Sequence, residues 1–343
     1  MTASADPDDN RFLVLDQVSQ HFELGRGLLS RTSRGTVKAV DKVSLTVRRG
    51  EILGLVGESG CGKSTLSRTI MQLLRPTSGR IVLEGNELSA LAERDIRRER
   101  INFQMIFQDP YASLNPRMTV FDSLAEAVRT RHGQARGDDL RRRVATLLRT
   151  VGLSSGQMHK YPHEFSGGQR QRIAIARALA PEPKLIIADE PVSALDVSIQ
   201  SQILNLLKRL AGEMGLTMIF ISHDLAVVRY IADRIAVMYL GRIVELGDAE
   251  AIVDRPLHLY TRALMSAIPR PDPRLERSRK RIILDGDPPS PLDPPSGCSF
   301  WPRSPVPHDE RMKSVEPVLA EFAPGHFAAD CPFCVAAGTL AGD

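Results

Sequence analysis

The chain reads Gly57-Glu58-Ser59-Gly60-Cys61-Gly62-Lys63-Ser64-Thr65 directly after the apolar run Ile52-Leu53-Gly54-Leu55-Val56. This stretch fits the phosphate-loop pattern G-x-x-x-x-G-K-S/T, and the residues around it predict a buried strand before it and an apolar-periodic helix after it. Its glycines let backbone N–H groups turn towards a triphosphate, because residues without a Cβ tolerate positive φ and close approach. An ordinary strand-to-helix connector is the alternative, but the strand, the spacing and the Lys-Ser pair favour a phosphate site.

Two side chains of this loop have chemistry that suits a nucleotide. Lys63 opens the predicted helix, whose N-terminal dipole attracts anions, and its ammonium group can reach the β- and γ-phosphates. The Ser64 hydroxyl is placed to ligate Mg²⁺. The predicted nucleotide-binding residues of the loop are Gly57, Glu58, Ser59, Gly60, Cys61, Gly62, Lys63, Ser64 and Thr65.

The composition is typical of a soluble globular protein. The chain has 343 residues, of which 42% are hydrophobic and 25% charged, enough for one large or two ordinary domains. No run approaches the ~20 apolar residues needed to cross a bilayer, and the polar, acidic start is unlike a signal peptide. The net charge of +4 is too small to indicate nucleic acid. Four cysteines make no disulfide framework, so we expect a cytosolic protein.

The order of strands and helices predicts an α/β fold with a helical insert. Alternating and apolar runs predict strands at 12–24, 39–50, 185–188, 217–221, 235–239 and 242–246, a surface loop at 25–37 and a hairpin-like stretch at 79–85. Apolar spacings of three and four predict an all-helical insert at about 113–180, and helices at 198–211 and from Asp224. Strands alternating with helices imply a mainly parallel sheet with its ligand at the carboxyl ends of the strands.

The composition changes beyond about residue 256. Eleven prolines lie between Pro269 and Pro307, which predicts an irregular tail or a small appended module with little helix. The chain is therefore divided into a nucleotide-binding domain at 1–260, with the helical part at 113–180 inserted, and a Pro-rich extension at 261–343.

The apolar strand Leu185-Ile186-Ile187-Ala188 ends in two acids. Asp189 is placed to hold Mg²⁺ indirectly, and Glu190, one residue beyond the strand, to deprotonate a water for in-line attack on the γ-phosphate. Adjacent acids are also common at surface turns, but the phosphate loop favours the functional interpretation.

Two further residues follow apolar runs. His223 comes after the strand at 217–221, and if that strand neighbours 185–188, its imidazole can hold the water and Glu190 in line. A histidine after a strand is also often structural. The neutral amide of Gln108 can sense Mg²⁺ or water and transmit occupancy of the site to the helical insert.

A second anion site is predicted where the helix after Phe165 begins. Ser166, Gly167, Gly168 and Gln169 place a hydroxyl and bare N–H groups at a positive helix end. One nucleotide does not need two such helix ends from one chain. We therefore expect this turn to serve a nucleotide that another subunit holds.

These motifs, in this order and spacing, resemble the nucleotide-binding subunit of ABC transporters. The resemblance covers residues 11–269 and includes the phosphate loop, Gln108, the Ser166 turn, the acidic strand, Ser193-Ala194-Leu195-Asp196 and His223. It implies a P-loop NTPase (RecA-like) core with an antiparallel β subdomain. It also implies a head-to-tail dimer that sandwiches two ATP molecules with Mg²⁺, and it adds Asp196 to the nucleotide-binding residues.

Four longer stretches resemble the oligopeptide/dipeptide permease ATPases in particular, and among these the second of their two dissimilar ATPase subunits. These stretches are 105–119, 161–165, 256–261 and 290–298. By this analogy Phe22 stacks on adenine, although a simple core phenylalanine is an equal alternative.

The cysteines of the tail depart from this family's pattern. Some related tails carry four cysteines and resemble iron–sulfur sites. Here Cys298 is present, whereas Ser304 and Met312 stand where two more thiolates are expected. Cys331 and Cys334 remain, with His326 nearby, and such a pair favours an ordinary structural role over an iron–sulfur cluster.

The resemblance predicts an ATPase subunit that powers uptake of peptides or a related solute. Its expected partners are a second, non-identical ABC ATPase subunit, two transmembrane permease subunits and an extracytoplasmic binding protein, with no nucleic acid, at the cytoplasmic side of the membrane. The alternative is a soluble ABC ATPase acting on nucleic acid or the ribosome, but such chains usually carry two ATPase units or a long coiled coil. Glu190 and His223 argue against a third possibility, an inactive regulatory subunit.

Overall fold

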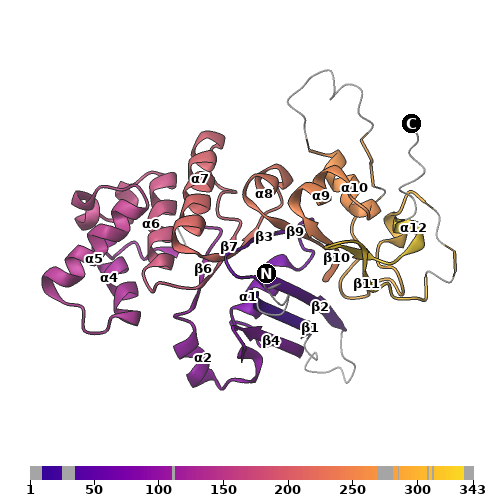
Figure 1. The fold of residues 1–343 in the computed structure, drawn as a ribbon, viewed down its shortest axis with the longest axis horizontal. Coiled ribbons are helices and arrows are strands. Elements are labelled where there is room, and N and C mark those ends of the chain that lie inside the picture. Colours follow the sequence, from indigo (N-terminus) through magenta and orange to yellow (C-terminus); the bar gives the residue numbers. More distant parts are fainter. Residues whose placement is uncertain are drawn as a thin grey trace, which may run out of the picture. The chain divides into compact units, whose positions relative to one another are not determined.

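The computed structural model describes residues 10–24, 35–109, 113–268, 281–284, 286–306, 309–310 and 313–335. Most of the loop expected at 25–37, part of the Pro-rich stretch and Met312 lie outside these residues. The described residues form two compact units, drawn as ribbons in Figure 1. The first holds 10–12, Val47–Ile52 and Ala90–Ser222, and the second holds Leu13–Thr46, Leu53–Ser89 and the residues from His223 onward.

A parallel sheet forms the centre of the first unit. Its strands are β6 (Phe103–Ile106), β7 (Leu185–Asp189) and β8 (Thr217–Ile221), in that order. Every residue of β7 and β8 is buried, as expected for continuous apolar runs in a parallel sheet. β7 and β8 are neighbours, which is the condition that the interpretation of His223 required. Their carboxyl ends lie at one edge of the sheet because the strands are parallel.

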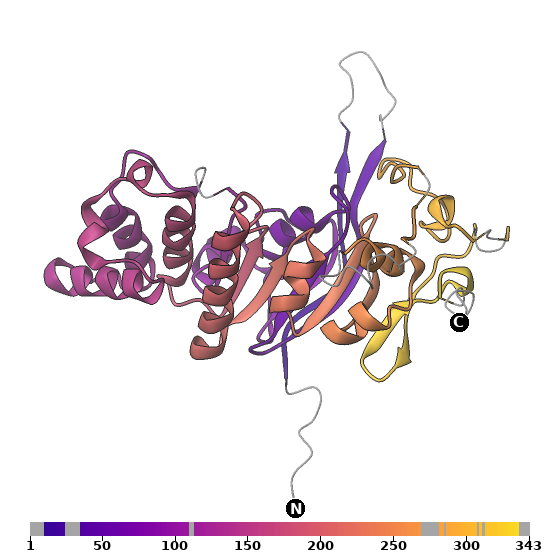
Figure 2. The same cartoon turned by 90° about the horizontal axis from the view of Figure 1, so that it is seen from above.

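The first unit also contains several α-helices. They are α2 (Glu93–Glu99), α4 (Val120–Arg131), α5 (Gly137–Thr150), α6 (Gly167–Leu179) and α7 (Val197–Met214). The apolar residues that predicted helices by their spacing, such as Leu124, Val128, Val144 and Leu148, are buried, and α4, α5 and α6 pack on one another. These three helices are the magenta group in Figure 2.

The second unit contains two sheets. An outer sheet has the order β2-β1-β4-β5, where β1 is Arg11–Glu23, β2 is Thr36–Arg48, β4 is Ser78–Leu83 and β5 is Asn86–Glu87. Antiparallel pairing of β1 with β4 and of β4 with β5 makes this the antiparallel subdomain that the resemblance implies. The helix α1 (Lys63–Ile70) follows β3 (Ile52–Val56).

The other sheet of the second unit includes strands of the tail. In it β3 pairs in parallel with β9 (Arg234–Tyr239), and β10 (Arg242–Asp248) is antiparallel to β9. Two strands that the sequence analysis did not predict, β12 (His326–Ala329) and β11 (Leu319–Ala323), extend it beyond β10. The short helices are α8 (Leu225–Ile231), α9 (Ala249–Asp254), α10 (Leu259–Ser266) and α12 (Pro332–Val335). The tail is therefore partly ordered into the sheet.

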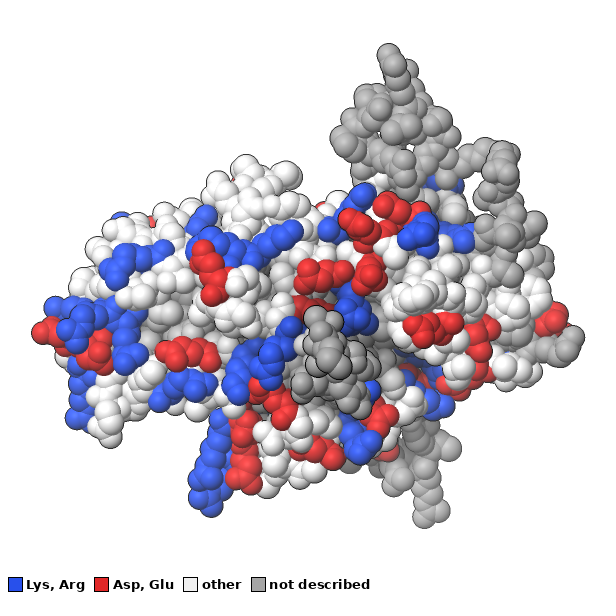
Figure 3. Space-filling view, in the orientation of Figure 1, with Lys and Arg blue, Asp and Glu red and all other residues white. Residues whose placement is uncertain are grey.

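The distribution of surface charge and the hydrophobicity of the helices agree with the composition. Figure 3 shows Lys and Arg side chains interspersed with Asp and Glu over the face in view, as a net charge of +4 predicts. Within the described part of the chain, no helix combines the length and apolar character needed to cross a membrane.

Candidate nucleotide site

The phosphate loop of the second unit takes a conformation that two of its glycines allow. It joins β3 to α1, and Gly57 and Gly62 have φ values of 152° and 110°. A Cβ on Gly57 would lie 2.2 Å from the carbonyl oxygen of Met238, and one on Gly62 would lie 2.1 Å from that of Ala39. Both positions therefore exclude a side chain, and the loop stays open to an anion at the N-terminus of α1.

Lys63 lies inside this loop. Its Nζ donates hydrogen bonds to the carbonyl oxygens of Gly57, at 2.8 Å, and Glu58, at 2.9 Å. The side chain is only 6% exposed, whereas its neighbour Ser64 is exposed. Burial raises the pKa of the Cys61 thiol, so this residue stays neutral beside the cation. The loop thus presents an ammonium group, a hydroxyl and backbone N–H groups together, which fits a nucleotide triphosphate.

Glu58 of this loop is held by two residues that the sequence analysis did not place in the site. Its backbone N–H donates to the hydroxyl oxygen of Tyr260 at 2.9 Å. Its carboxylate accepts two hydrogen bonds from Arg303, at 2.7 and 3.2 Å. Arg303 is 7% exposed and belongs to the Pro-rich extension. Nothing in the pattern around Arg303 connects it with a loop 245 residues away.

An aromatic cluster supports this contact. The rings of Tyr239 and Tyr260 lie 4.7 Å apart, and Phe300 of the extension packs 5.5 Å from Tyr239. Burial raises the pKa of Tyr239 to about 12 and also raises that of Tyr260. The Tyr260 hydroxyl therefore remains protonated at neutral pH, so no phenolate charge arises beside the phosphate loop.

In the first unit, the ends of β6 and β7 bring Gln108 and Glu190 together. The Gln108 side-chain amide donates to the Glu190 carboxylate at 3.0 Å. Glu190 has a φ of 47°, an uncommon conformation for a residue with a side chain, and its N–H donates to the carbonyl oxygen of Ile221 at 3.0 Å. Asp189, the last residue of β7, is buried. The sequence analysis named these residues separately, and the register of the sheet explains why two of them meet.

The Ser166 turn of the first unit is a complete helix cap. The Ser166 hydroxyl accepts from the Gln169 N–H at 3.4 Å, and the Gln169 side chain accepts from the Ser166 N–H at 3.0 Å. A Cβ on Gly168 would lie 2.4 Å from Ile199 of α7, so glycine permits the close packing of α6 and α7. Ser166 is exposed, and the turn therefore presents its hydroxyl and the start of α6 to solvent. Asp196 is the exposed N-cap residue of α7.

The two remaining predicted residues lie in the second unit. His223 is exposed and follows β8 by two positions. Phe22 lies near the end of β1 and is 37% exposed. That exposure contradicts the alternative that Phe22 is a simple core residue, and it leaves the ring accessible to a planar ligand.

Comparisons with known proteins match two regions of the chain to known families. Residues 40–193 match the ABC transporter family, and residues 244–310 match the C-terminal region of oligopeptide/dipeptide transporters. The chain is 55% identical over 309 residues to the oligopeptide transport ATP-binding protein OppF of Escherichia coli, covering 90% of this chain and 92% of that protein. It is 51% identical over 318 residues to YkfD of Bacillus subtilis, a putative oligopeptide transport ATP-binding protein, covering 92% and 94%.

Solved structures of ATP-binding cassettes have the same fold. The dimeric cassette MJ0796, solved with ADP and Pi, superposes with a TM-score of 0.61 at 29% identity, over 69% of this chain and 98% of that one. The protein cbiO1 of Clostridium perfringens, part of the transporter complex cbiONQ, superposes with a TM-score of 0.61 at 28% identity, over 72% and 92%.

Proposed function

The chain belongs to the oligopeptide transport ATP-binding proteins of the ABC transporter family, and on that premise we propose that it hydrolyses ATP to power uptake of peptides or a related solute. The observation that carries the proposal is the hydrogen bond from Gln108 to Glu190 at the carboxyl ends of two parallel strands. This hydrogen bond orients the Glu190 carboxylate just beyond the end of β7. An oriented carboxylate in this position is suited to act as the general base for hydrolysis.

Each predicted side chain has a role in binding or hydrolysis that its chemistry allows. Lys63 and the N–H groups of the phosphate loop bind the β- and γ-phosphates, and Phe22 stacks on the adenine. Glu190 accepts a proton from the attacking water, while Gln108 and His223 orient that water. Mg²⁺ neutralises phosphate charge when bound, and the oxygen donors of Ser64, Gln108 and Asp189 are the ligand types that it prefers.

A second ATPase subunit completes each nucleotide site in this proposal. Among the described helices, α1 and α6 have N-termini suited to phosphate, and Ser166 at the start of α6 is exposed. Ser166, Gly167, Gly168 and Gln169 would contact the ATP held by the facing subunit, with Asp196 at the same interface. The facing subunit is a non-identical paralogue, and the pair sits on two transmembrane permease subunits at the cytoplasmic side of the membrane. An extracytoplasmic binding protein delivers the solute.

The proposal divides the chain into two domains. Residues 1–260 form the nucleotide-binding domain with the helical part at 113–180 inserted, and 261–343 form the extension. Both contribute to the nucleotide site, because Arg303 of the extension holds Glu58 of the loop.

Reconstitution of the complete transporter tests the function. The chain would be purified with its membrane partners in vesicles that enclose ATP, with binding protein and labelled oligopeptide outside. We expect uptake that needs ATP and is lost when Glu190→Gln replaces the wild-type chain. ATP-dependent uptake of a solute that is not a peptide would overturn the peptide assignment, and copurification with nucleic acid in place of membrane subunits would overturn transport.

A further inference from the structure

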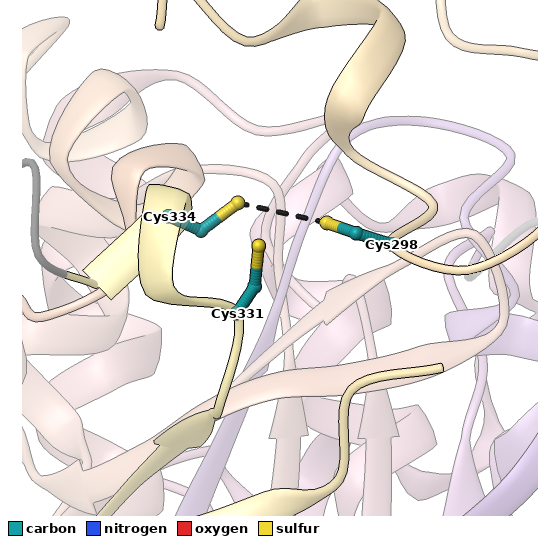
Figure 4. Close-up of side chains that lie close together, drawn as sticks. All are labelled: Cys298, Cys331 and Cys334. Atoms are coloured by element: carbon teal, nitrogen blue, oxygen red, sulfur yellow. Dashed lines mark hydrogen bonds between the residues drawn. The ribbon is translucent and has the colours of Figure 1, made fainter. Parts of the chain in front are cut away.

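Three cysteines from distant parts of the extension converge in the second unit. Cys298, Cys331 and Cys334 point towards one another, with 3.6 Å between the Sγ atoms of Cys298 and Cys334 (Figure 4). All three Sγ atoms lie within 4.8 Å of one another. The residues are at most 3% exposed and none is in a disulfide. Cys298 lies in the segment before Trp301, Cys331 lies directly before α12, and Cys334 lies within α12, 36 residues after Cys298.

The spacing of the sulfur atoms suits a single metal ion. Four tetrahedral ligands at about 2.3 Å from zinc are about 3.8 Å from one another, close to the distance between Cys298 and Cys334. In an iron–sulfur cluster the thiolates bind different iron atoms and therefore need more room and, usually, a fourth thiolate. The separation of these thiols is too small for that arrangement.

Two described residues that could offer a fourth ligand, Ser304 and His326, have other partners. The Ser304 hydroxyl donates to the carbonyl oxygen of Val306 at 2.9 Å and accepts from the Val306 N–H at 3.2 Å. His326 is used elsewhere, since its Nε2 lies 2.8 Å from the buried carboxylate of Glu245. Among the described residues, the metal-binding group therefore consists of three thiols, and an iron–sulfur cluster does not fit it.

We propose that Cys298, Cys331 and Cys334 bind one Zn²⁺ ion through three thiolates, with water in the fourth position. Soft thiolate ligands select zinc over Mg²⁺ and Ca²⁺. A cavity of about 500 Å³ reaches Cys298, and its lining includes Gly297, Phe300 and Glu316. This cavity supplies the entry path and the solvent that a three-ligand site needs.

The ion would join two separate segments of the extension. Cys331 follows β12, which pairs with β10, and Cys298 precedes Phe300 and Arg303, which contact the aromatic cluster and Glu58. Zinc binding therefore links two parts of the extension. One is the segment around Arg303, which contacts the phosphate loop, and the other is the strand β12. Binding of the ion adds its binding free energy to the stability of the folded extension.

The metal content of the purified full-length chain tests the proposal. The protein would be prepared anaerobically with a reductant, and zinc, iron and acid-labile sulfide would be measured beside protein concentration. We expect about one zinc per chain and no sulfide in the wild type. Cys61→Ala, which removes a buried thiol outside the group, should keep the zinc, and Cys331→Ser should lose it.

A second measurement does not depend on the folding of a variant. Wild-type protein stripped of metal by a chelator and titrated with Co²⁺ should develop thiolate-to-cobalt charge-transfer absorption that saturates at about one equivalent. Restoring zinc should raise the melting temperature by about 4 °C or more. Iron with sulfide, a Cys298–Cys334 disulfide in the anaerobic protein, absence of any cobalt absorption, or zinc retained by Cys331→Ser would each overturn the proposal.

Discussion

Arg303 binds the carboxylate of Glu58 through two hydrogen bonds, of 2.7 and 3.2 Å, across 245 residues of sequence. The guanidinium group is almost fully buried, whereas the side chain of Glu58 is 28% exposed. A planar, bidentate contact of this kind fixes orientation as well as charge. Arg303 of the C-terminal extension therefore contacts the predicted phosphate loop directly and neutralises an acid within it.

Loss of Arg303 should weaken ATP binding. In Arg303→Met the Glu58 carboxylate is left without its counter-charge beside the triphosphate, and we expect affinity to fall about 5- to 30-fold, equivalent to about 1–2 kcal/mol. Calorimetric titration with ATP measures this. Arg281→Met, a change at an exposed arginine of the same extension, is the control. Adding Glu58→Gln to Arg303→Met should recover much of the affinity for ATP. Equal affinities of the wild type, the two single variants and the double variant would contradict a role of Arg303 in ATP binding.

Glu190→Gln should slow ATP hydrolysis by roughly 10²–10⁴-fold, the usual contribution of a positioned base. The amide keeps the shape of the carboxylate but cannot accept the proton, so ATP should still bind and trap the dimer. Steady-state phosphate release and size-exclusion chromatography with ATP measure the two effects. Near-normal turnover in this variant would place the base elsewhere.

Gln108→Glu should change how the hydrolysis rate depends on pH. A second carboxylate 3.0 Å from Glu190, where the amide lies now, places two like charges together and disfavours the state in which both are ionised. The base is then protonated over more of the pH range. The acidic limb of the profile of kcat against pH should therefore move to higher pH, whereas Gln108→Met, with no charge, should lower kcat without that movement. Identical profiles for the two variants would show that Gln108 is not near the base in the working enzyme.

The charge at position 166 should matter only in the assembled pair. Aspartate and asparagine both cap helices about as well as serine, so Ser166→Asp and Ser166→Asn keep α6 but differ in charge. We expect Ser166→Asp to abolish ATPase activity of the pair, because a carboxylate would face the partner's triphosphate, and Ser166→Asn to retain more of it. Binding of ATP to the isolated chain should be unchanged in both. Equal activities of the two variants would argue against a facing site.

An ion-pair network should make the second unit lose stability in acid. Arg242 contacts both Asp41 and Glu316, and Lys42 lies 3.2 Å from Glu316. Burial by itself raises the pKa of Asp41 and Glu316, but the hydrogen bonds from Arg242 outweigh it and both values are lowered, from 3.8 and 4.5. Carboxylates with lowered pKa stabilise the fold above their unfolded values and lose that contribution as pH falls through the folded values.

The corresponding experiment compares melting temperatures across pH. Glu316→Gln should melt below the wild type at pH ~7, and the difference should close as the pH falls below about 4, where the wild-type carboxylates are protonated. Glu310→Gln, which removes an exposed acid paired only with Lys313 among the contacts described, should match the wild type throughout. If the difference in melting temperature between the wild type and Glu316→Gln stayed constant down to pH ~3, the loss of stability would come from packing and not from charge.

The strands and helices that carry the candidate site could be predicted from the local pattern of apolar residues. The apolar run before Asp189 predicted β7, and the three- and four-residue spacing of Leu124, Val128 and Val144 predicted the helices that bury them. The sequence left open whether β7 and β8 are neighbours, and only the pairing of the strands in the sheet decided it. The sequence analysis did not predict β11 and β12, which are only five and four residues long and therefore too short to show a clear apolar alternation.

The sequence by itself determined the phosphate loop, the general base candidate and the order of elements, because each depends on residues adjacent in the chain and on how those residues hydrogen-bond and bury locally. Only the tertiary structure decided that Arg303 holds Glu58 and that Cys298 joins Cys331 and Cys334. Such contacts depend on how strands pair and loops close over long separations, and that choice is made by the packing of the whole second unit.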